Sequence, residues 1–538
     1  MIAGNNEEPN LGTTEWFAEG AIEYVANGTL LHAGIIDAPA LTVETKLRRS
    51  GALAAVLAAS LAAGLVAAGA AKADDATPTP GQAWRTLTRI DVEAGYQLLK
   101  DNHPGAAPEA QDPAFVSALE AGHKRALERA DMVTSYEGYV ATLGEFARSV
   151  GDGHVWSNAR FLPRTVRWAG IVATKRGPDW VVASDDAKVA GADLLGAKIV
   201  SCDGEPTDAL ARDVLHYRTV VSVDAMQVVY GGWLLIDEGN PFLQQPKACD
   251  FDRSGKRATL TLNWNSIGRS DLIEHHWYQP LGHAGFDLRQ SGQGYWIAMQ
   301  ELWADAQKVI DQANAKATEI RAAPYVVVDV RGNGGGRDRY ARDLAEAVYG
   351  APYVEAKLGP KDAAGGGCEQ VYRATAGNIR SISAAADHFG KEGDATAAAE
   401  YTRAVTAMKA AQAAGHALTG PAVCKHKAQS GSHGGASLMQ GKVYLLTDAG
   451  CFSSCIQAAQ FFTKLGATQI GQTTGADTHY SQVFEITLPS GMATFSTLRS
   501  IMTDAPKAIG PYVPKIAYEG DIADTASLEK WVGEIARR

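Results

Sequence analysis

The chain has 538 residues, enough for roughly three domains of about 150 residues each. Hydrophobic residues make up 46% of the sequence, which is ample for sizeable cores, and the formal net charge is −10. A negative chain whose Lys and Arg are dispersed lacks the basic stripe of a nucleic-acid-binding protein. We therefore expect a large globular protein that does not bind nucleic acid.

Residues 46–73 have the pattern of a secretory signal peptide. Basic residues at 46–49 precede an apolar run that ends at Ala71, and a small-residue cleavage site follows before Asp74. Residues 1–45 show no clear periodicity, and we interpret them as a mis-called upstream extension. The alternative is an uncleaved membrane anchor, because about 20 apolar residues can span a bilayer. Both interpretations predict an exported protein, periplasmic or secreted, that contacts a membrane only if the leader is retained.

The sequence predicts a mixed α/β fold class with a definite order of regions. A Pro/Thr-rich linker at 74–82 leads into a helical N-terminal domain at 83–160. A β-rich domain at 161–290 follows. Strand and helix then alternate over 291–538, which indicates an α/β layer. An Ala-rich helical insert of two helices is expected within that last region, at 363–435.

Local signals refine the first two domains. Thr134 and Glu137 have the spacing of a capping box before an apolar helix face. The segment from Trp168 to Val172 reads as one strand. The stretch from Leu194 to Pro206 reads as a strand ending in an Asp-Gly turn and resembles the last part of a PDZ-type module. A plain β-domain is the alternative interpretation.

Six cysteines fit an oxidising compartment, although the sequence does not choose among their pairings. Cys368 and Cys424 form an attractive pair because they flank the helical insert. Cys451 and Cys455 bracket a candidate serine, and we expect packing or a disulfide there. Zinc is disfavoured, since no second close Cys or Cys/His pair accompanies them. We predict no metal site.

The most informative run extends from Val326 to Gly336. Its first part is apolar and β-branched, which is typical of a fully buried strand. Its second part contains the glycine loop, residues Gly332–Gly336, where the lack of side chains lets backbone N–H groups approach a ligand closely. A phosphate loop and a dinucleotide fingerprint both fail, because Arg337 stands where their patterns need other residues. A plain tight turn remains an alternative.

A second apolar strand, Val443–Thr447, leads to Ser453 at the start of a predicted helix. Free N–H groups and positive potential at a helix N-terminus favour negative charge beside that serine. The alternative is that Ser453 or Ser454 merely caps the helix. Acyl transfer needs a nucleophile, a base and donors for an oxyanion. The serine and the glycine loop together would supply two of these three parts.

These residues resemble the C-terminal processing (tail-specific) serine peptidases, including the branch of the tricorn core and the retinoid-binding-protein repeats. The signature D-[LV]-R-x-N-x-G-G matches Asp329–Gly336. The nucleophile helix and the G-E-T-T-G loop match Cys451–Gly475. Shorter matches are His103–Gly105, Gly151–His154 and a worn match at Gly510–Pro514.

The resemblance implies a crotonase-like catalytic core of the ClpP/crotonase type that cleaves peptide bonds. It places the nucleophile at Ser453 and the oxyanion donors at the backbone N–H groups of Gly335 and Ser454. Gly336 would then allow close packing of the loop. Asp329 and Arg331 would brace the loop rather than touch substrate.

The chain departs from the family at the base. Many members use lysine, but Thr473–Ser481 contains none. Tricorn-like relatives use a histidine from the N-terminal side, and His154 matches it; imidazole can take and return a proton near neutrality. His479 is the alternative base. No third triad member is assigned, since Asp152 is too close in sequence for an easy contact with His154.

The sequence thus predicts an exported serine peptidase that acts on unfolded or tail-bearing proteins through an acyl-enzyme and needs no cofactor. The alternative is a non-catalytic ligand- or peptide-binding protein on the same scaffold, since fold does not fix function. A crotonase-type acyl-group enzyme is a remoter alternative, because export separates it from coenzyme A substrates.

Overall fold

A computed structural model describes residues 79–359, 370–420, 435–503 and 505–538. The predicted extension, the leader, most of the linker and the Cys368–Cys424 pair lie outside these residues. Within them, no helix combines the length and the apolar character needed to cross a membrane.

The C-terminal part is built on a six-stranded sheet, and the described strands follow the order β11-β12-β13-β15-β16-β21. Strand β11 is antiparallel to β12, and the remaining neighbours are parallel. The strand bounds are β11 Phe286–Ser291, β12 Gly294–Met299, β13 Tyr325–Asp329, β15 Lys442–Thr447, β16 Thr468–Gly471 and β21 Ile516–Ala517. The predicted α/β layer is therefore present.

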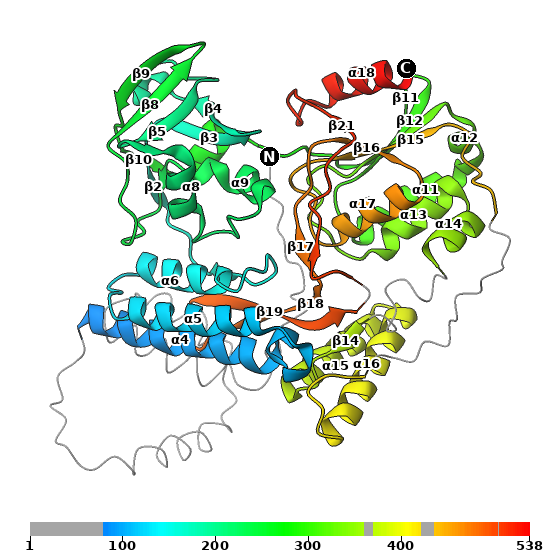
Figure 1. Ribbon diagram of the computed structural model, residues 1–538, viewed down its shortest axis with the longest axis horizontal. Coiled ribbons are helices and arrows are strands. Elements are labelled where there is room, and N and C mark those ends of the chain that lie inside the picture. The colour runs from blue at the N-terminus through cyan, green and yellow to red at the C-terminus, as the bar shows by residue number, and fades with distance from the viewer. Residues whose placement is uncertain (1–78, 360–369, 421–434, 504) are drawn as a thin grey trace, which may run out of the picture.

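Helices cover both faces of this sheet, as Figure 1 shows. Strand β13 explains why: Val326 and Val328 enter one core, and Tyr325 and Val327 enter the other. One face packs against α18 Thr525–Ala536. The other face packs against several helices: α11 Ala304–Ala315, α13 Arg339–Tyr349 and α17 Ser454–Lys464, with α12 Ala317–Ala322 and α14 Ala351–Leu358 nearby. Such two-sided burial selects the continuous apolar run seen in the sequence.

The middle part is β-rich. Its main sheet has the order β3-β4-β5-β8-β9, with β6 paired to β5. The bounds are β3 Ile171–Arg176, β4 Asp179–Asp185, β5 Lys198–Cys202, β6 Glu205–Pro206, β8 Ala248–Arg253 and β9 Lys256–Thr261, with helices α7 Ala187–Ala190, α8 Thr207–Leu215 and α9 Asp224–Tyr230 and the 3-10 turn η3 Gly231–Trp233. A disulfide between Cys202 and Cys249 joins β5 to β8.

A smaller sheet adjoins it and corrects one prediction. The segment predicted as a single strand from Trp168 to Val172 is broken, because Gly170 turns the chain with φ +79°. Trp168, before the break, ends β2 Thr165–Trp168, whereas Ile171, after it, begins β3. Strand β2 lies between β10 Asn265–Gly268 and β7 Ile236–Asp237 in the smaller sheet. Helix α10 Arg269–Asp271 and the π-turn η4 Leu272–His276 follow β10.

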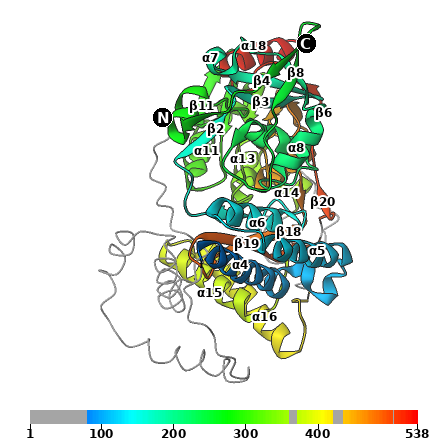
Figure 2. The ribbon, with the colours of Figure 1, turned by 90° about the vertical axis from the view of Figure 1, so that its left-hand side faces the viewer.

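The N-terminal helices share a core with a C-terminal hairpin. Side chains of α4 and α6, such as Leu99 and Phe146, pack with Phe495 and Leu498 of β19. Figures 1 and 2 both show the hairpin strands lying against these helices. The bounds are α4 Pro80–Asn102, η1 Pro104–Ala106, η2 Pro108–Ala110, α5 Pro113–Ala130, α6 Tyr136–Arg148, β1 Ser157–Ala159, β14 Gln370–Tyr372, β18 Tyr480–Thr487 and β19 Ala493–Met502. The first and last parts of the chain are therefore held together.

Two further predictions concern helices. The N-cap of α6 is Ser135, whose side chain accepts from the Gly138 N–H, so the capping box predicted at Thr134 is wrong by one residue. The predicted two-helix insert contains α15 Ala376–Lys391 and α16 Ala395–Ala413, which pack against each other.

Candidate active site

Ser453 occupies a sharp turn between β15 and α17. Its backbone has φ 55° and ψ −127°, a conformation that costs a non-glycine residue energy and recurs at functional sites. The strand–turn–helix placement is the one that exposes a nucleophilic serine at the edge of a sheet. The Ser453 side chain is partly exposed and makes no capping hydrogen bond. Ser453 therefore stands at the N-cap position of α17, but its side chain does not cap the helix.

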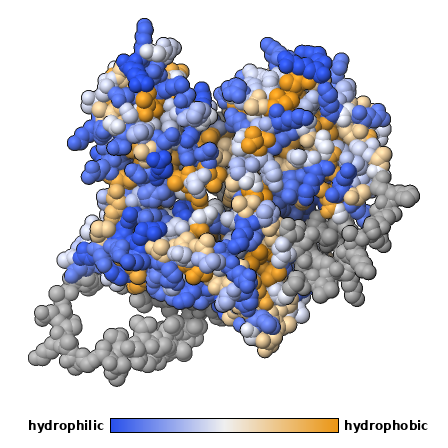
Figure 3. Space-filling model, in the orientation of Figure 1, coloured by the Kyte–Doolittle hydropathy of each residue, from blue (hydrophilic) through white to orange (hydrophobic). Residues whose placement is uncertain are grey.

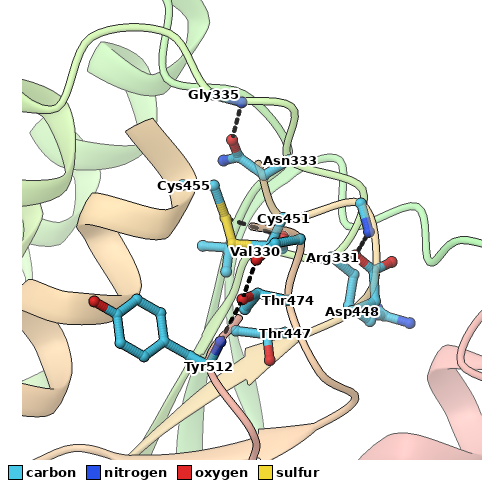
Figure 4. Close-up of a disulfide and its surroundings, with 12 residues drawn as sticks. Val330, Arg331, Asn333, Gly335, Thr447, Asp448, Cys451, Cys455, Thr474 and Tyr512 are labelled. Carbon is cyan, nitrogen blue, oxygen red and sulfur yellow. Dashed lines mark hydrogen bonds between the residues drawn. A yellow bond between two sulfur atoms is a disulfide. The ribbon is translucent and has the colours of Figure 1, made fainter. Parts of the chain in front are cut away.

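A disulfide spans this turn. Cys451 and Cys455 are fully buried and joined by an S–S bond of 2.02 Å, as Figure 4 shows beside Val330 and Asn333. The bond confirms that these cysteines are structural rather than reactive thiols. It also ties the first turn of α17 to the residues just before Ser453.

The glycine loop meets the serine in space. A methyl carbon added at Gly335, which has φ 114°, would lie 2.7 Å from the Ser453 Cβ and 3.0 Å from the Ser454 backbone nitrogen. One added at Gly336 would lie 2.3 Å from the Leu302 carbonyl oxygen. Both positions therefore require glycine: Gly335 for the approach to the nucleophile, and Gly336 for packing.

The backbone N–H groups near Ser453 differ in whether they already have a hydrogen-bond acceptor. Among the described residues, the Ser454 N–H has no hydrogen-bond acceptor. The Gly335 N–H, expected from the sequence to bind an oxyanion, instead donates to Asn333 Oδ1 at 2.9 Å. This differs from the prediction because Asn readily bonds the backbone two residues further on. The Gly336 carbonyl accepts from the Ser454 hydroxyl at 2.7 Å, so the loop backbone faces the nucleophile turn.

His154 lies beside the nucleophile turn on the loop that follows α6. Its ring packs against the Phe452 ring with centroids 4.6 Å apart, and Phe452 directly precedes Ser453. The His154 Nδ1 atom lies 3.1 Å from Asp477 Oδ1 and 3.5 Å from Asp152 Oδ1. Nδ1 is buried and not aligned for a hydrogen bond with either, which is common in catalytic sites without substrate.

Contacts with the C-terminal hairpin hold the His154 loop. The Ser496 hydroxyl on β19 donates to the His154 carbonyl at 2.8 Å, and the Thr478 hydroxyl donates to Asp152 Oδ2 at 2.5 Å. Asp152 Oδ1 in turn accepts from the His154 N–H at 2.7 Å. Thr478 belongs to β17 Asp477–Thr478, which pairs with β20 Ala508–Ile509. Residues more than 300 positions apart thus hold the backbone of the His154 loop and the Asp152 side chain.

Asp477 is the site residue that sequence reasoning missed. It lies in the segment where the resemblance implies a lysine, so an acidic residue there was the available signal. The reasoning about Asp152 was also wrong, because a turn between Asp152 and His154 brings the two side chains within ion-pair distance.

Electrostatics favour a charged imidazole. Burial opposes the charge, but the carboxylates of Asp477 and Asp152 outweigh it and raise the pKa of His154 to about 10. Burial likewise opposes ionisation of Asp152, whereas His154 and Thr478 lower its pKa below the ordinary value. In the described residues, Asp152, His154 and Asp477 are also the only group of three potential metal ligands found. An imidazole between carboxylates equally suits proton transfer.

His479, the alternative base, lies in a neighbouring place. It lines a cavity of about 320 Å³ with Asp152, Tyr480 and Lys507. Its ring packs edge-on against Tyr480, and its N–H donates to the Lys507 carbonyl at 3.2 Å. Burial lowers the pKa of His479. The described contacts of His479 are thus with residues other than those of the nucleophile turn.

Buried carboxylates hold the two loops together. Arg331 donates to Asp329 at 2.6 and 2.9 Å, and both side chains are almost fully buried. Asp448, which the sequence did not single out, accepts from the N–H groups of Gly332 and Gly450, each at 2.9 Å. Burial raises the pKa of Asp448 to about 6 despite these bonds. One carboxylate therefore links the start of the glycine loop to the nucleophile turn.

The sequence profile of peptidase family S41 matches residues 294–509. The match contains the glycine loop, Ser453 and Asp477. Over these residues the chain is similar to peptidase family S41. It is a serine-type peptidase, and His154 lies before the matched region.

Two solved structures of CPAF are similar in fold to this chain. A serine-to-alanine variant of CPAF gives a TM-score of 0.54 at 10% identity, covering 84% of this chain and 98% of that chain. Mature CPAF complexed with lactacystin gives 0.53 at 10% identity, covering 84% and 99%. The photosystem II D1 C-terminal processing protease reaches only 0.32 at 12% identity, over 80% and 93%. No curated protein matches the sequence.

Proposed function

We propose that this peptidase hydrolyses peptide bonds of unfolded or tail-bearing proteins through an acyl-enzyme formed on Ser453. The observation that carries the proposal is the contact between the strained serine turn and the glycine loop. At Gly335 an added methyl carbon would lie 2.7 Å from the serine Cβ. This leaves room for a substrate carbonyl only because the loop has no side chain there.

Each proposed step uses a group of this chain. The Ser453 hydroxyl attacks the carbonyl carbon while His154 takes its proton. The tetrahedral intermediate collapses as His154 returns that proton to the leaving amine. Water then attacks the acyl-enzyme with His154 again as base, which regenerates the serine. Asp477, 3.1 Å from His154 Nδ1, orients the imidazole and stabilises its charge.

The oxyanion would be held by backbone N–H groups on both sides of the serine. The Ser454 N–H is the first donor, since it begins α17 and has no acceptor among the described residues. The second comes from the glycine loop, and Gly335 can supply it only if the substrate oxygen displaces Asn333 Oδ1. Each such donor is worth a few kcal/mol, roughly 3, in the transition state.

Finer features of the fold belong to the same proposal. We assign the parallel sheet with its covering helices to a crotonase-like core, and the middle sheet with α8 to a PDZ-like module. The regions 83–160, 161–290 and 291–538 are proposed as domains, although the N-terminal helices share their core with β18 and β19. The two disulfides, Cys202–Cys249 and Cys451–Cys455, support an exported protein.

A matched pair of serine variants tests the nucleophile. Ser453→Ala should lower kcat for cleavage of an unfolded protein by about 1,000-fold or more. Its melting temperature should change little, because the side chain makes no hydrogen bond that the fold needs. Ser454→Ala is the control: it loses only the bond to the Gly336 carbonyl and keeps its N–H, so we expect a loss of no more than about tenfold.

Cleavage measured on gels and melting measured by calorimetry give both readouts. Full activity in Ser453→Ala would exclude this nucleophile. Equal losses in the two variants would mean that the turn, rather than the Ser453 hydroxyl, was being disturbed.

A further inference from the structure

Helix α9 and the turn η3 lie across the edge of the middle sheet. Lys175 of β3 donates to Gln227 of α9 at 2.6 Å, and Gly231 of η3 sits so close to Trp180 that a methyl carbon there would lie 2.9 Å from its ring. Gln227 also donates to the Val221 carbonyl at 2.8 Å, which holds the start of the helix. The middle part therefore fixes the position of α9.

The same helix reaches the catalytic part through Met226. A methyl carbon at Gly475 would lie 3.4 Å from the Met226 Cε and 3.5 Å from the Phe452 Cδ2. Gly475 is itself bonded to the nucleophile turn, since its N–H donates to the Cys451 carbonyl at 2.9 Å. Met226 and Phe452 thus flank one point beside the turn that carries Ser453.

These two side chains leave part of their apolar surface exposed to solvent. Met226 and Phe452 are both only partly buried, and the Phe452 ring also packs against the His154 ring. Apolar area left partly in water is favourably covered by an apolar ligand. Methionine adapts its shape to different partners because its side chain is flexible and polarizable. Figure 3 shows apolar surface on both parts of the molecule beside the hollow that separates them.

We propose that Met226 and Phe452 form an apolar subsite, which binds a large aliphatic or aromatic side chain of the substrate beside the scissile bond. The inference rests on the proposed function, because the subsite is defined by its position next to Ser453. It assigns Met226 as a specificity-determining residue contributed by the middle part, which lies outside the matched family region of 294–509.

Peptides that differ at one position test the subsite. A set carrying Phe, Leu, Ala or Lys at each position flanking the cleaved bond is assayed for kcat/KM with wild-type enzyme, Met226→Leu and Met226→Glu. Changing contacts in an apolar pocket alters discrimination by about 10- to 200-fold. We expect Met226→Leu to keep the wild-type preference, and Met226→Glu to lower the Phe-to-Lys ratio at least tenfold at one position.

Met132→Glu is the matched control, because Met132 is 60% exposed in the turn that follows α5, on the N-terminal helical part. It should leave the ratio unchanged. A ratio that is the same in Met226→Glu and wild type, with both cleaving, would overturn the subsite and leave the proposed function intact.

A binding readout separates the two claims. If wild type cleaves none of the peptides, the proposed function fails, and fluorescence anisotropy with Ser453→Ala decides the subsite. Tighter binding of the Phe peptide than of the Lys peptide, lost on adding Met226→Glu, would support it. Equal binding of both peptides, or no binding, would overturn it.

Discussion

The two halves of the proposed site, a nucleophile half around Ser453 and a base half around His154, are built in different ways. Ser453 and the glycine loop follow neighbouring parallel strands, β15 and β13, and are joined through Asp448. His154 comes from a loop that precedes the sheet by more than 100 residues, and side chains of β19 and β17 hold that loop. The nucleophile half is therefore fixed by one sheet, whereas the base half depends on packing between distant parts of the chain.

This difference predicts where substitutions act. Changes near Ser453 should affect catalysis through local geometry, since the turn is braced by buried bonds. Changes near His154 should affect catalysis through its charge and position, since carboxylates and hairpin contacts determine both. The middle part approaches the nucleophile half through α9, since a methyl carbon added at Gly475 would lie 3.4 Å from the Met226 Cε.

The largest expected effect concerns the choice of base. His154→Ala should lower kcat by about 100-fold or more, since general base catalysis typically contributes 10²–10⁴-fold. His479→Ala should retain most activity, because its described contacts are with Tyr480 and Lys507. Steady-state cleavage assays measure both. A large loss confined to His479→Ala would reverse the assignment.

The next effect is a displaced pH profile. The carboxylates of Asp477 and Asp152 raise the pKa of His154 to about 10, so the neutral base is scarce at pH 7 and kcat/KM should increase with pH up to at least pH 9. Asp477→Asn removes one of these charges and should move this limb to lower pH while reducing kcat. An Asp477→Asn profile identical to that of wild type would remove Asp477 from the site.

The raised pKa of His154 also makes the stability of the folded protein depend on pH. Because the folded pKa of His154 is raised, its contribution is fully present below the ordinary value of 6.5 and is lost as pH rises towards about 10. Melting temperatures of wild type and His154→Ala should therefore converge over this window. Divergence with increasing pH would contradict the raised pKa.

The nucleophile half and the middle part each contain one disulfide, and removing the two bonds should have different effects on stability and activity. Cys202–Cys249 closes 47 residues and Cys451–Cys455 only 4, so chain entropy predicts losses of about 4 and about 2 kcal/mol in unfolding free energy. Replacing Cys451 and Cys455 by Ser should also lower kcat about tenfold, because the strained Ser453 turn can relax.

Replacing Cys202 and Cys249 by Ala should leave kcat of the folded enzyme unchanged. Chemical denaturation and cleavage assays on the two double variants provide the comparison. A larger loss of kcat in the Cys202 and Cys249 variant would show that the middle part, rather than the turn, positions the serine.

The smallest effect involves the helical insert, which contacts the residue after the glycine loop through the Arg337–Asp394 ion pair at 2.8 Å. Burial, with repulsion from Asp338, raises the pKa of Glu400 to about 7. The folded state therefore binds more protons than the unfolded state between pH 4.5 and 7, and stability falls as pH rises through this range, by at most about 3 kcal/mol. Glu400→Gln should flatten this slope in pH-dependent melts without changing kcat; an unchanged slope would contradict it.

The nucleophile half could be read from the sequence because its signals are local. The apolar β-branched run before the glycine loop predicts a buried strand. The consecutive glycines predict that the loop backbone approaches another part of the site closely. The two cysteines around Ser453 likewise predicted structural packing or a disulfide at this turn. The hydrogen bond from the Gly335 N–H to Asn333 also has a local signal, since Asn bonds the backbone two residues further on.

The base half could be read only in part. The motif around His154 pointed to a base, but its partner Asp477 depends on a hairpin that folds back onto a loop more than 300 residues earlier. No local pattern encodes that pairing. The break at Gly170 and the cap at Ser135 show the same limit on a small scale, because neighbouring residues compete for one turn or one cap.

The most direct measurement of the central claim is covalent labelling of the active serine. A fluorophosphonate forms a bond with a serine only where a base and oxyanion donors activate it. Peptide mass mapping should find the adduct on Ser453, and the labelling rate should fall at least 100-fold in His154→Ala. An adduct on another residue, or labelling at an equal rate in both proteins, would contradict the account.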